Sequence, residues 1–149
     1  MPASLLLIEG PAGSGKSRVV REMLDSREVD IAVDMTALWA AIRGIERNPE
    51  TGRYPIRDDE DPAPPVVQYL MTVAVRQALT NGLRTVVTSG SPDRAAYWAG
   101  IATGHNASFH VRSEDPGESV VRERLAAFGG SPETLTPQCE RAVRRWYVA

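Results

Sequence analysis

The residues best suited to chemistry lie near the amino terminus, at positions 10–17, which read G-P-A-G-S-G-K-S. This is the pattern G-x-x-x-x-G-K-[ST] of a phosphate-binding loop. Its glycines allow successive backbone N–H groups to turn inward around phosphate oxygens. Lys16 would reach the β- and γ-phosphates, and the Ser17 hydroxyl would ligate Mg²⁺. The pattern predicts that the chain binds a nucleoside triphosphate, ATP or GTP, together with Mg²⁺.

The segments on either side of this loop are those that it requires. The apolar run from Leu5 to Ile8 is typical of a buried strand, and Ser17 to Leu24 has helical spacing without a breaker. The start of that helix would direct its positive dipole end at the bound anion. A chance glycine-rich turn is the alternative, but it leaves the register of strand, loop and helix unexplained. We expect contacts to the nucleotide from Gly10, Pro11, Ala12, Gly13, Ser14, Gly15, Lys16, Ser17 and Arg18.

Strand and helix signals alternate along the rest of the chain, which favours an α/β fold. We expect a three-layer P-loop NTPase fold, with a mainly parallel sheet of about four to five strands flanked by helices. Residues 1–149 would form a single domain. The expected strands are 4–9, 30–34, 84–88 and 107–112, and the expected helices are 15–26, 36–47, 65–81, 92–103, 118–128 and 137–147.

Asp34 follows the second expected strand, at the carboxyl edge of the sheet. In an open parallel sheet that edge borders the ligand crevice, so a carboxylate there would face the γ-phosphate region. It could accept a proton from an acceptor hydroxyl or hold a metal-bound water. The alternative is a structural role as the N-cap of the next helix, since aspartate is a favoured cap. The two roles are compatible.

Arg122 and Arg124 follow the fourth expected strand. Phosphoryl transfer builds negative charge on the equatorial phosphate oxygens, and guanidinium groups can neutralise it. We therefore expect both arginines to assist catalysis. The alternative is an exposed helix face, on which Glu118 and Glu123 would form ordinary surface ion pairs with them.

The third expected strand lacks the acidic residue that hydrolytic P-loop proteins use to polarise water. Val86 and Val87 lead into Thr88-Ser89-Gly90, and the nearest acid, Asp93, falls inside the next expected helix. This absence weakens the case for a motor or remodelling ATPase and favours a kinase.

Several side chains between positions 39 and 61 could serve a phosphate acceptor. Arg43 and Arg47 are one helical turn apart and could hold a phosphate, with Arg53 and Arg57 in the loop beyond. Trp39 could stack on a base, but its place beside apolar neighbours favours a core position. The acidic run at residues 58–61 is expected to be a solvated loop.

Composition limits the remaining possibilities. The net charge of −2 argues against a protein that coats nucleic acid through bulk electrostatics. No apolar stretch approaches the roughly 20 residues that span a bilayer, and we find no secretory signal pattern. The single cysteine, Cys139, has no internal disulfide partner. We expect a cytoplasmic protein with no membrane association.

The loop, Asp34 and the Arg122/Arg124 segment resemble the small P-loop kinases grouped with polynucleotide kinase, zeta toxins and chloramphenicol phosphotransferase. The resemblance implies an ATP-dependent kinase in which Asp34 is the general base, Lys16 holds the transferring phosphate and Ser17 holds magnesium. The resemblance also implies that Arg122 and Arg124 occupy the positions of the lid arginines in that group. Residues 115–117 would then lie near the place where these kinases bind adenine.

The phosphate acceptor implied in this way is a hydroxyl or phosphate group on a nucleotide, a polynucleotide end or a small molecule. The alternative function is a nucleotide-binding regulatory or assembly ATPase with weak or no phosphotransfer.

Overall fold

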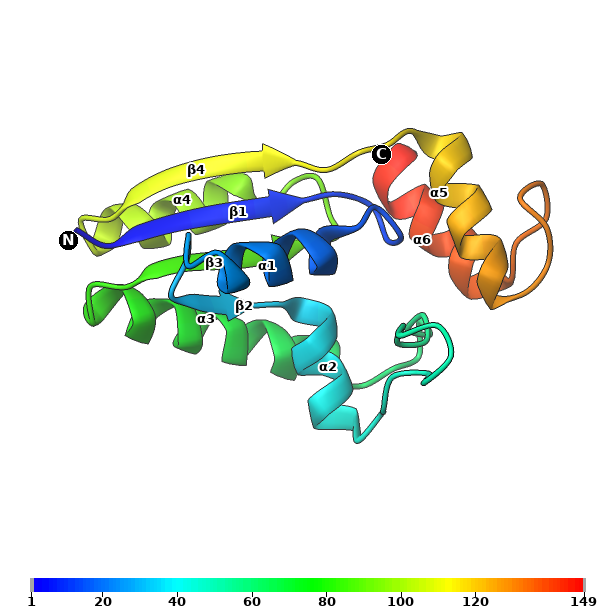
Figure 1. The fold of residues 1–149 in the computed structure, drawn as a ribbon, viewed down its shortest axis with the longest axis horizontal. Helices are drawn as coiled ribbons and strands as arrows, with labels where there is room; N and C mark the ends of the chain where they lie inside the picture. The colour runs from blue at the N-terminus through cyan, green and yellow to red at the C-terminus, as the bar shows by residue number, and fades with distance from the viewer. Residues whose placement is uncertain (1, 149) are drawn as a thin grey trace.

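The computed structural model describes residues 2–148 and places a four-stranded sheet at the centre of the molecule (Figure 1). Its strands are β1 (Ser4–Glu9), β2 (Ile31–Val33), β3 (Arg84–Ser89) and β4 (Ser108–Ser113). They lie in the order β2-β3-β1-β4, and every neighbouring pair is parallel. The carboxyl ends of all four strands therefore point to one edge of the sheet, where ligands of open α/β folds bind.

The connections between these strands are helical. The helices are α1 (Lys16–Asp25), α2 (Met35–Arg43), α3 (Pro64–Thr80), α4 (Ala95–Gly104), α5 (Glu118–Leu125) and α6 (Pro137–Tyr147), with a short 3-10 segment, η1 (Ala126–Phe128), after α5. No helix within residues 2–148 is long and apolar enough to cross a membrane.

Helices cover both faces of the sheet, which gives the three layers that the sequence predicts. Side chains of β1 alternate between the faces, so Ile8 packs with Val19 and Val20 of α1, whereas Leu5 and Leu7 belong to the core under α3 and α4. Figure 1 shows α1 on one side of the sheet and α3 and α4 on the other. The predicted fold class is confirmed.

α5 and α6 form a separate apolar cluster beyond the carboxyl ends of the strands (Figure 1). Val121, Leu125 and Val143 are fully buried in it, together with Cys139, which is a free thiol. Ala12 and Ile56 pack against this cluster. The helix pair is thus held against the phosphate-binding loop on one side and the long 44–63 segment on the other.

The end of α2 and the start of α4 differ from the sequence prediction by three or four residues, and the expected helix 118–128 is divided into α5 and the 3-10 segment η1. α2 ends at Arg43 and not at residue 47, because Gly44 adopts a left-handed conformation (φ 67°) that caps the helix. α4 begins at Ala95 and not at residue 92. The Ser89 hydroxyl bonds both the amide and the carbonyl of Ser91, and this local turn delays the helix.

Candidate active site at the carboxyl edge of the sheet

The phosphate-binding loop joins β1 to α1 at the carboxyl edge, as the sequence predicts. Gly13 and Gly15 have φ of 79° and 98°, values that favour glycine. Gly10 needs its missing side chain for another reason, since a Cβ there would collide with the backbone carbonyl of Glu114 and with the Ser14 hydroxyl. The buried Ser14 hydroxyl has no hydrogen-bond partner within the protein. The backbone is therefore shaped as an anion-binding loop before any ligand is considered.

Lys16 turns back into the mouth of this loop. Its Nζ donates to the carbonyl oxygens of Gly10 at 2.5 Å and Pro11 at 2.9 Å. Burial lowers the pKa of this amine from its ordinary value near 10.5 to about 8, an effect that the nearby Asp34 carboxylate partly opposes. The two direct hydrogen-bond acceptors of the amine are neutral carbonyls, whereas a nucleotide phosphate would offer it a negatively charged acceptor.

This lowered pKa makes the stability of the nucleotide-free protein depend on pH. Between about pH 8 and 10.5 the unfolded chain keeps a proton on Lys16 that the folded chain has released, so the free energy of unfolding rises with pH. We expect wild type to gain stability relative to Lys16→Met over that interval and not below it. Urea unfolding of both proteins from pH 7 to pH 10.5 measures the difference. A difference that does not change with pH would contradict this prediction.

Asp34 connects the phosphate-binding loop to α2 and β3. Its Oδ2 accepts a hydrogen bond from the Ser17 hydroxyl at 3.0 Å. Its Oδ1 accepts from the Thr36 amide and the Thr88 hydroxyl, each at 3.2 Å. Asp34 is therefore the N-cap of α2, as the structural alternative proposed, and it also faces the phosphate-binding loop. The two roles use different oxygens.

The sequence analysis missed Thr88 as a site residue. Its hydroxyl accepts from the Met35 amide at 3.0 Å and donates to Asp34, so it fixes the start of α2 against the end of β3. The signal in the sequence was a polar residue at the end of an apolar strand, in the pattern Val86-Val87-Thr88. The structure shows that this side chain is 97% buried. Thr88 lies on β3, the strand that lacks the acidic residue of hydrolytic P-loop proteins.

Removal of the Thr88 hydroxyl should cost stability. We expect Thr88→Val to lower the free energy of unfolding by about 1–3 kcal/mol, because the Met35 amide loses its acceptor while the shape of the side chain is kept. The matched control is Thr103→Val, which removes an exposed hydroxyl bonded only to its own helix and should change stability by less than about 0.5 kcal/mol. Urea unfolding measures both, and equal stabilities would contradict the role of Thr88.

The structure places the two predicted arginines differently. Arg124 donates from Nη1 to the Gly13 carbonyl at 2.9 Å, so it lies directly beside the phosphate-binding loop. Arg53, from the 44–63 segment, donates to the Arg124 carbonyl at 3.1 Å. Arg122 instead forms a two-point ion pair with Glu140 of α6, with N–O distances of 3.0 and 2.9 Å. This pair raises the pKa of Arg122 and lowers that of Glu140.

The other two predicted regions near the nucleotide lie at the edges of the site. Arg18 is highly exposed on α1 and contacts Glu22 at 3.9 Å. In the segment expected near adenine, Asp115 accepts hydrogen bonds from the Tyr147 hydroxyl and the Trp146 indole, which ties the end of α6 to the start of α5. The Tyr147 bond is the largest influence lowering the pKa of Asp115.

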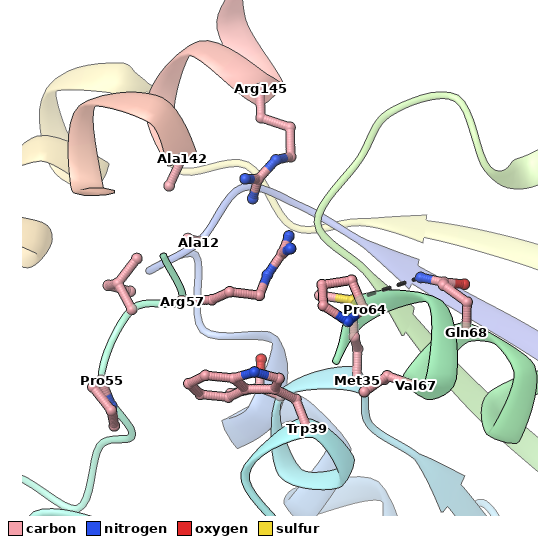
Figure 2. Close-up of a pocket in the computed structure, with 12 residues that line it drawn as sticks. Ala12, Met35, Trp39, Pro55, Arg57, Pro64, Val67, Gln68, Ala142 and Arg145 are labelled. Carbon is pink, nitrogen blue, oxygen red and sulfur yellow. Dashed lines mark hydrogen bonds between the residues drawn. The ribbon is translucent and has the colours of Figure 1, made fainter. Parts of the chain in front are cut away.

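A pocket opens beside the phosphate-binding loop, and Ala12 and Thr36 belong to its lining (Figure 2). We call it the Trp39 pocket. Its apolar wall consists of Met35, Trp39, Pro55, Ile56, Pro64 and Val67. Arg57 and Arg145 supply its charged groups, and Gln68 lines it as well. The Trp39 pocket is therefore a mixed apolar and cationic cavity, and it reaches Thr36, two residues after Asp34.

The remaining acceptor-side predictions have mixed outcomes. Trp39 is a core residue, only 6% exposed, as the more conservative interpretation has it. Arg43 pairs with Asp61 at 3.7 Å, and Arg47 lies over the Tyr54 ring, so neither lines the Trp39 pocket. The prediction of a fully solvated acidic run is wrong at Asp61, whose side chain is 6% exposed. It accepts from the Trp39 indole at 2.6 Å and from the Ala63 amide at the start of α3.

The donor groups at the site fit a magnesium ion. Among the residues that the structure describes, no cluster of three or more His, Cys, Asp or Glu side chains could hold a metal by itself. Mg²⁺ prefers oxygen ligands and commonly takes only one or two from the protein, with substrate phosphates and water supplying the others. The Ser17 hydroxyl and the Asp34 carboxylate meet that requirement.

Comparisons with known proteins agree with this geometry. A chain of the Pnkp1/Rnl/Hen1 RNA repair complex superposes with a TM-score of 0.64 at 16% identity, covering 97% of this chain and 43% of that one. A gluconokinase from Sinorhizobium meliloti 1021 gives 0.54 at 18% identity, with 97% and 75% covered. The tunicamycin resistance protein of Deinococcus radiodurans gives 0.52 at 18% identity, with 96% and 79% covered.

These identities show a shared fold, and this chain spans less than half the length of the RNA repair chain. No curated protein matches the sequence. The family described as an AAA domain matches residues 5–144, which include the phosphate-binding loop, Asp34 and both predicted arginines. The fold that the resemblance implies is thus confirmed, and the chain belongs to the family described as an AAA domain.

Proposed function

We propose that this protein is a phosphotransferase that moves the γ-phosphate of ATP or GTP to an acceptor bound in the Trp39 pocket. The observation that carries the proposal is the position of Asp34. One carboxylate oxygen is held by Thr36 and Thr88, and the other points to Ser17 of the phosphate-binding loop. The pocket begins next to it, at Thr36. A base that is fixed between the phosphates and an open cavity suits transfer to an acceptor hydroxyl.

Each residue then has a defined task. The backbone amides of residues 10–17 would bind the polyphosphate, and Lys16 would leave the Gly10 and Pro11 carbonyls to pair with the transferring phosphate. Magnesium would supply charge neutralisation and orientation of the phosphates, held through Ser17 and the Asp34 side. If the Ser17 hydroxyl turned toward Mg²⁺, Oδ2 of Asp34 would be free to accept the proton of the acceptor hydroxyl.

Arg124 is the arginine best placed to neutralise charge that develops on the transferred group, since it already contacts Gly13. Arg122 could take part only if its ion pair with Glu140 opened. We therefore keep both arginines in the proposal but assign the direct role to Arg124.

The test is an acceptor screen with ATP labelled at the γ-phosphate and with Mg²⁺ present. The acceptors are nucleosides, nucleotides, oligonucleotides with free 5′-hydroxyls, sugars and phosphorylated alcohols, and the labelled product is separated by chromatography. We expect one class to be labelled in a Lys16-dependent manner. Tight Mg–nucleotide binding without a labelled product from any class would contradict the proposal and support a regulatory protein.

A further inference from the structure

Two arginines from distant parts of the chain face the same cavity. Arg57 comes from the 44–63 segment and Arg145 from the last turn of α6, and both line the Trp39 pocket. Figure 2 shows their guanidinium groups extending toward one another above the Trp39 ring. Arg57 is half-buried and Arg145 is exposed, and two like charges directed into one cavity repel each other. Such an arrangement is expected where an anion is to be bound.

Within residues 2–148, no carboxylate forms an ion pair with Arg57 or Arg145, although Asp61 acts on Arg57 and Asp59 acts on Arg145 at longer range. Asp59 raises the pKa of Arg145 through its charge, but its ion pair is with Arg141. Asp61 is engaged by the Trp39 indole, the Ala63 amide and Arg43. Burial and then the charge of Arg57 lower the pKa of Arg145, and the charge of Asp59 opposes them only in part.

The chemistry of the pocket indicates what kind of anion fits. A single carboxylate is matched by one guanidinium fork, whereas a phosphate monoester carries up to two charges and three terminal oxygens. Two convergent guanidinium groups match the phosphate monoester better. The wall opposite them is apolar and includes Trp39, Met35 and Pro64, so the rest of the ligand should be apolar or aromatic.

We propose that the Trp39 pocket binds a phosphate monoester group between Arg57 and Arg145, so that the acceptor is a hydroxyl compound that already carries a phosphate. The identification of this ligand as the acceptor rests on the proposed function. The anion site itself is separate from the nucleotide phosphates, which the loop at residues 10–17 would hold, although Ala12 borders both.

The test uses phenyl phosphate as the probe and isothermal titration calorimetry as the measurement. The protein is first saturated with Mg²⁺ and the non-hydrolysable analogue AMP-PNP, so that the phosphate-binding loop is occupied. Phenol, which lacks the phosphate, and benzoate, which carries one charge, are titrated in parallel. We expect phenyl phosphate to bind more tightly than either.

Variants assign the binding to the two arginines. We expect Arg57→Gln and Arg145→Gln each to weaken phenyl phosphate binding by about tenfold or more, the effect of losing a charge-assisted hydrogen bond. Arg144→Gln is the matched control, because Arg144 is an exposed neighbour of Arg145 that does not line the pocket. It should change nothing. AMP-PNP affinity should stay within about twofold in all three variants.

Four outcomes would overturn the inference. The first is unchanged phenyl phosphate binding in both pocket variants, and the second is benzoate binding as tight as that of phenyl phosphate. The third is that Arg57→Gln and Arg145→Gln weaken AMP-PNP binding and leave phenyl phosphate binding unchanged, which would mean that the two arginines bind the nucleotide. The fourth is transfer to unphosphorylated alcohols that Arg57→Gln does not impair. Arginine-dependent binding of phenyl phosphate with no transfer to any acceptor would instead confirm the anion site and contradict only the proposed function.

Discussion

Lys16→Met should reduce the rate of phosphate transfer by about 10²-fold or more and should weaken Mg–nucleotide binding as well. The reason is that Lys16 enters the mouth of the phosphate-binding loop, where its amine bonds the Gly10 and Pro11 carbonyls. A preorganised donor removed from such a site typically costs about 10²–10³ in rate. Methionine keeps the apolar length of the side chain, so packing changes little. Calorimetry with Mg–ATP and the labelled-phosphate assay measure the two effects.

Lys16→Arg is the matched variant for this prediction. It restores the charge with a larger, planar group that must fit the same narrow loop, so we expect only partial recovery of nucleotide binding. Wild-type affinity and rate in Lys16→Met would show that the loop does not hold the transferring phosphate through this residue. Absence of heat with every Mg–triphosphate on folded wild-type protein would overturn nucleotide binding altogether.

Asp34→Asn should abolish most transfer while leaving the fold almost unchanged and lowering the Mg–nucleotide affinity much less than the rate. Asparagine is as good a helix N-cap as aspartate, so the bond to the Thr36 amide can be kept while the proton acceptor is lost. Loss of a general base typically costs about 10²–10⁴ in rate. The labelled-phosphate assay gives the rate, and calorimetry with Mg–AMP-PNP gives the affinity.

Asp34→Ala separates the cap from the base. It should match Asp34→Asn in activity but should also lower the free energy of unfolding by about 1 kcal/mol, because alanine cannot cap α2. If Asp34→Asn transfers phosphate at the wild-type rate, Asp34 is a cap only, and another group must accept the proton.

The phosphate-binding half of the site could be predicted from the sequence because its signals are local. The loop, the strand before it and the helix after it lie within residues 4–25, and the loop spelling itself requires glycine conformations that the structure contains at Gly13 and Gly15. The end of α2 and the start of α4 were harder to predict from the sequence. They depend on a left-handed Gly44 and on a Ser89 side-chain turn, and the apolar spacing of the helices carries no information about either.

The acceptor half depends on contacts that sequence spacing does not reveal. Arg57 and Arg145 are far apart in the chain and meet only because the α5–α6 pair is held against the 44–63 segment. Arg43 and Arg47 have the more suggestive helical spacing, but Gly44 ends the helix between them and each finds another partner. No sequence motif marks Thr88 as a site residue. Its role depends on its hydrogen bond to Asp34, which is 54 residues away in the sequence.

The position of Lys16 also has a consequence for covalent chemistry. It is the only lysine among the 149 residues, so its amine is the one side-chain amine that an acylating reagent can find. With a pKa of about 8, a large share of it is the unprotonated nucleophile at mildly alkaline pH. Acylation at this residue, detected as a mass shift on one peptide, therefore reports whether the loop is empty or filled. Nucleotide analogues with an electrophile near the γ-position would find a single lysine to modify.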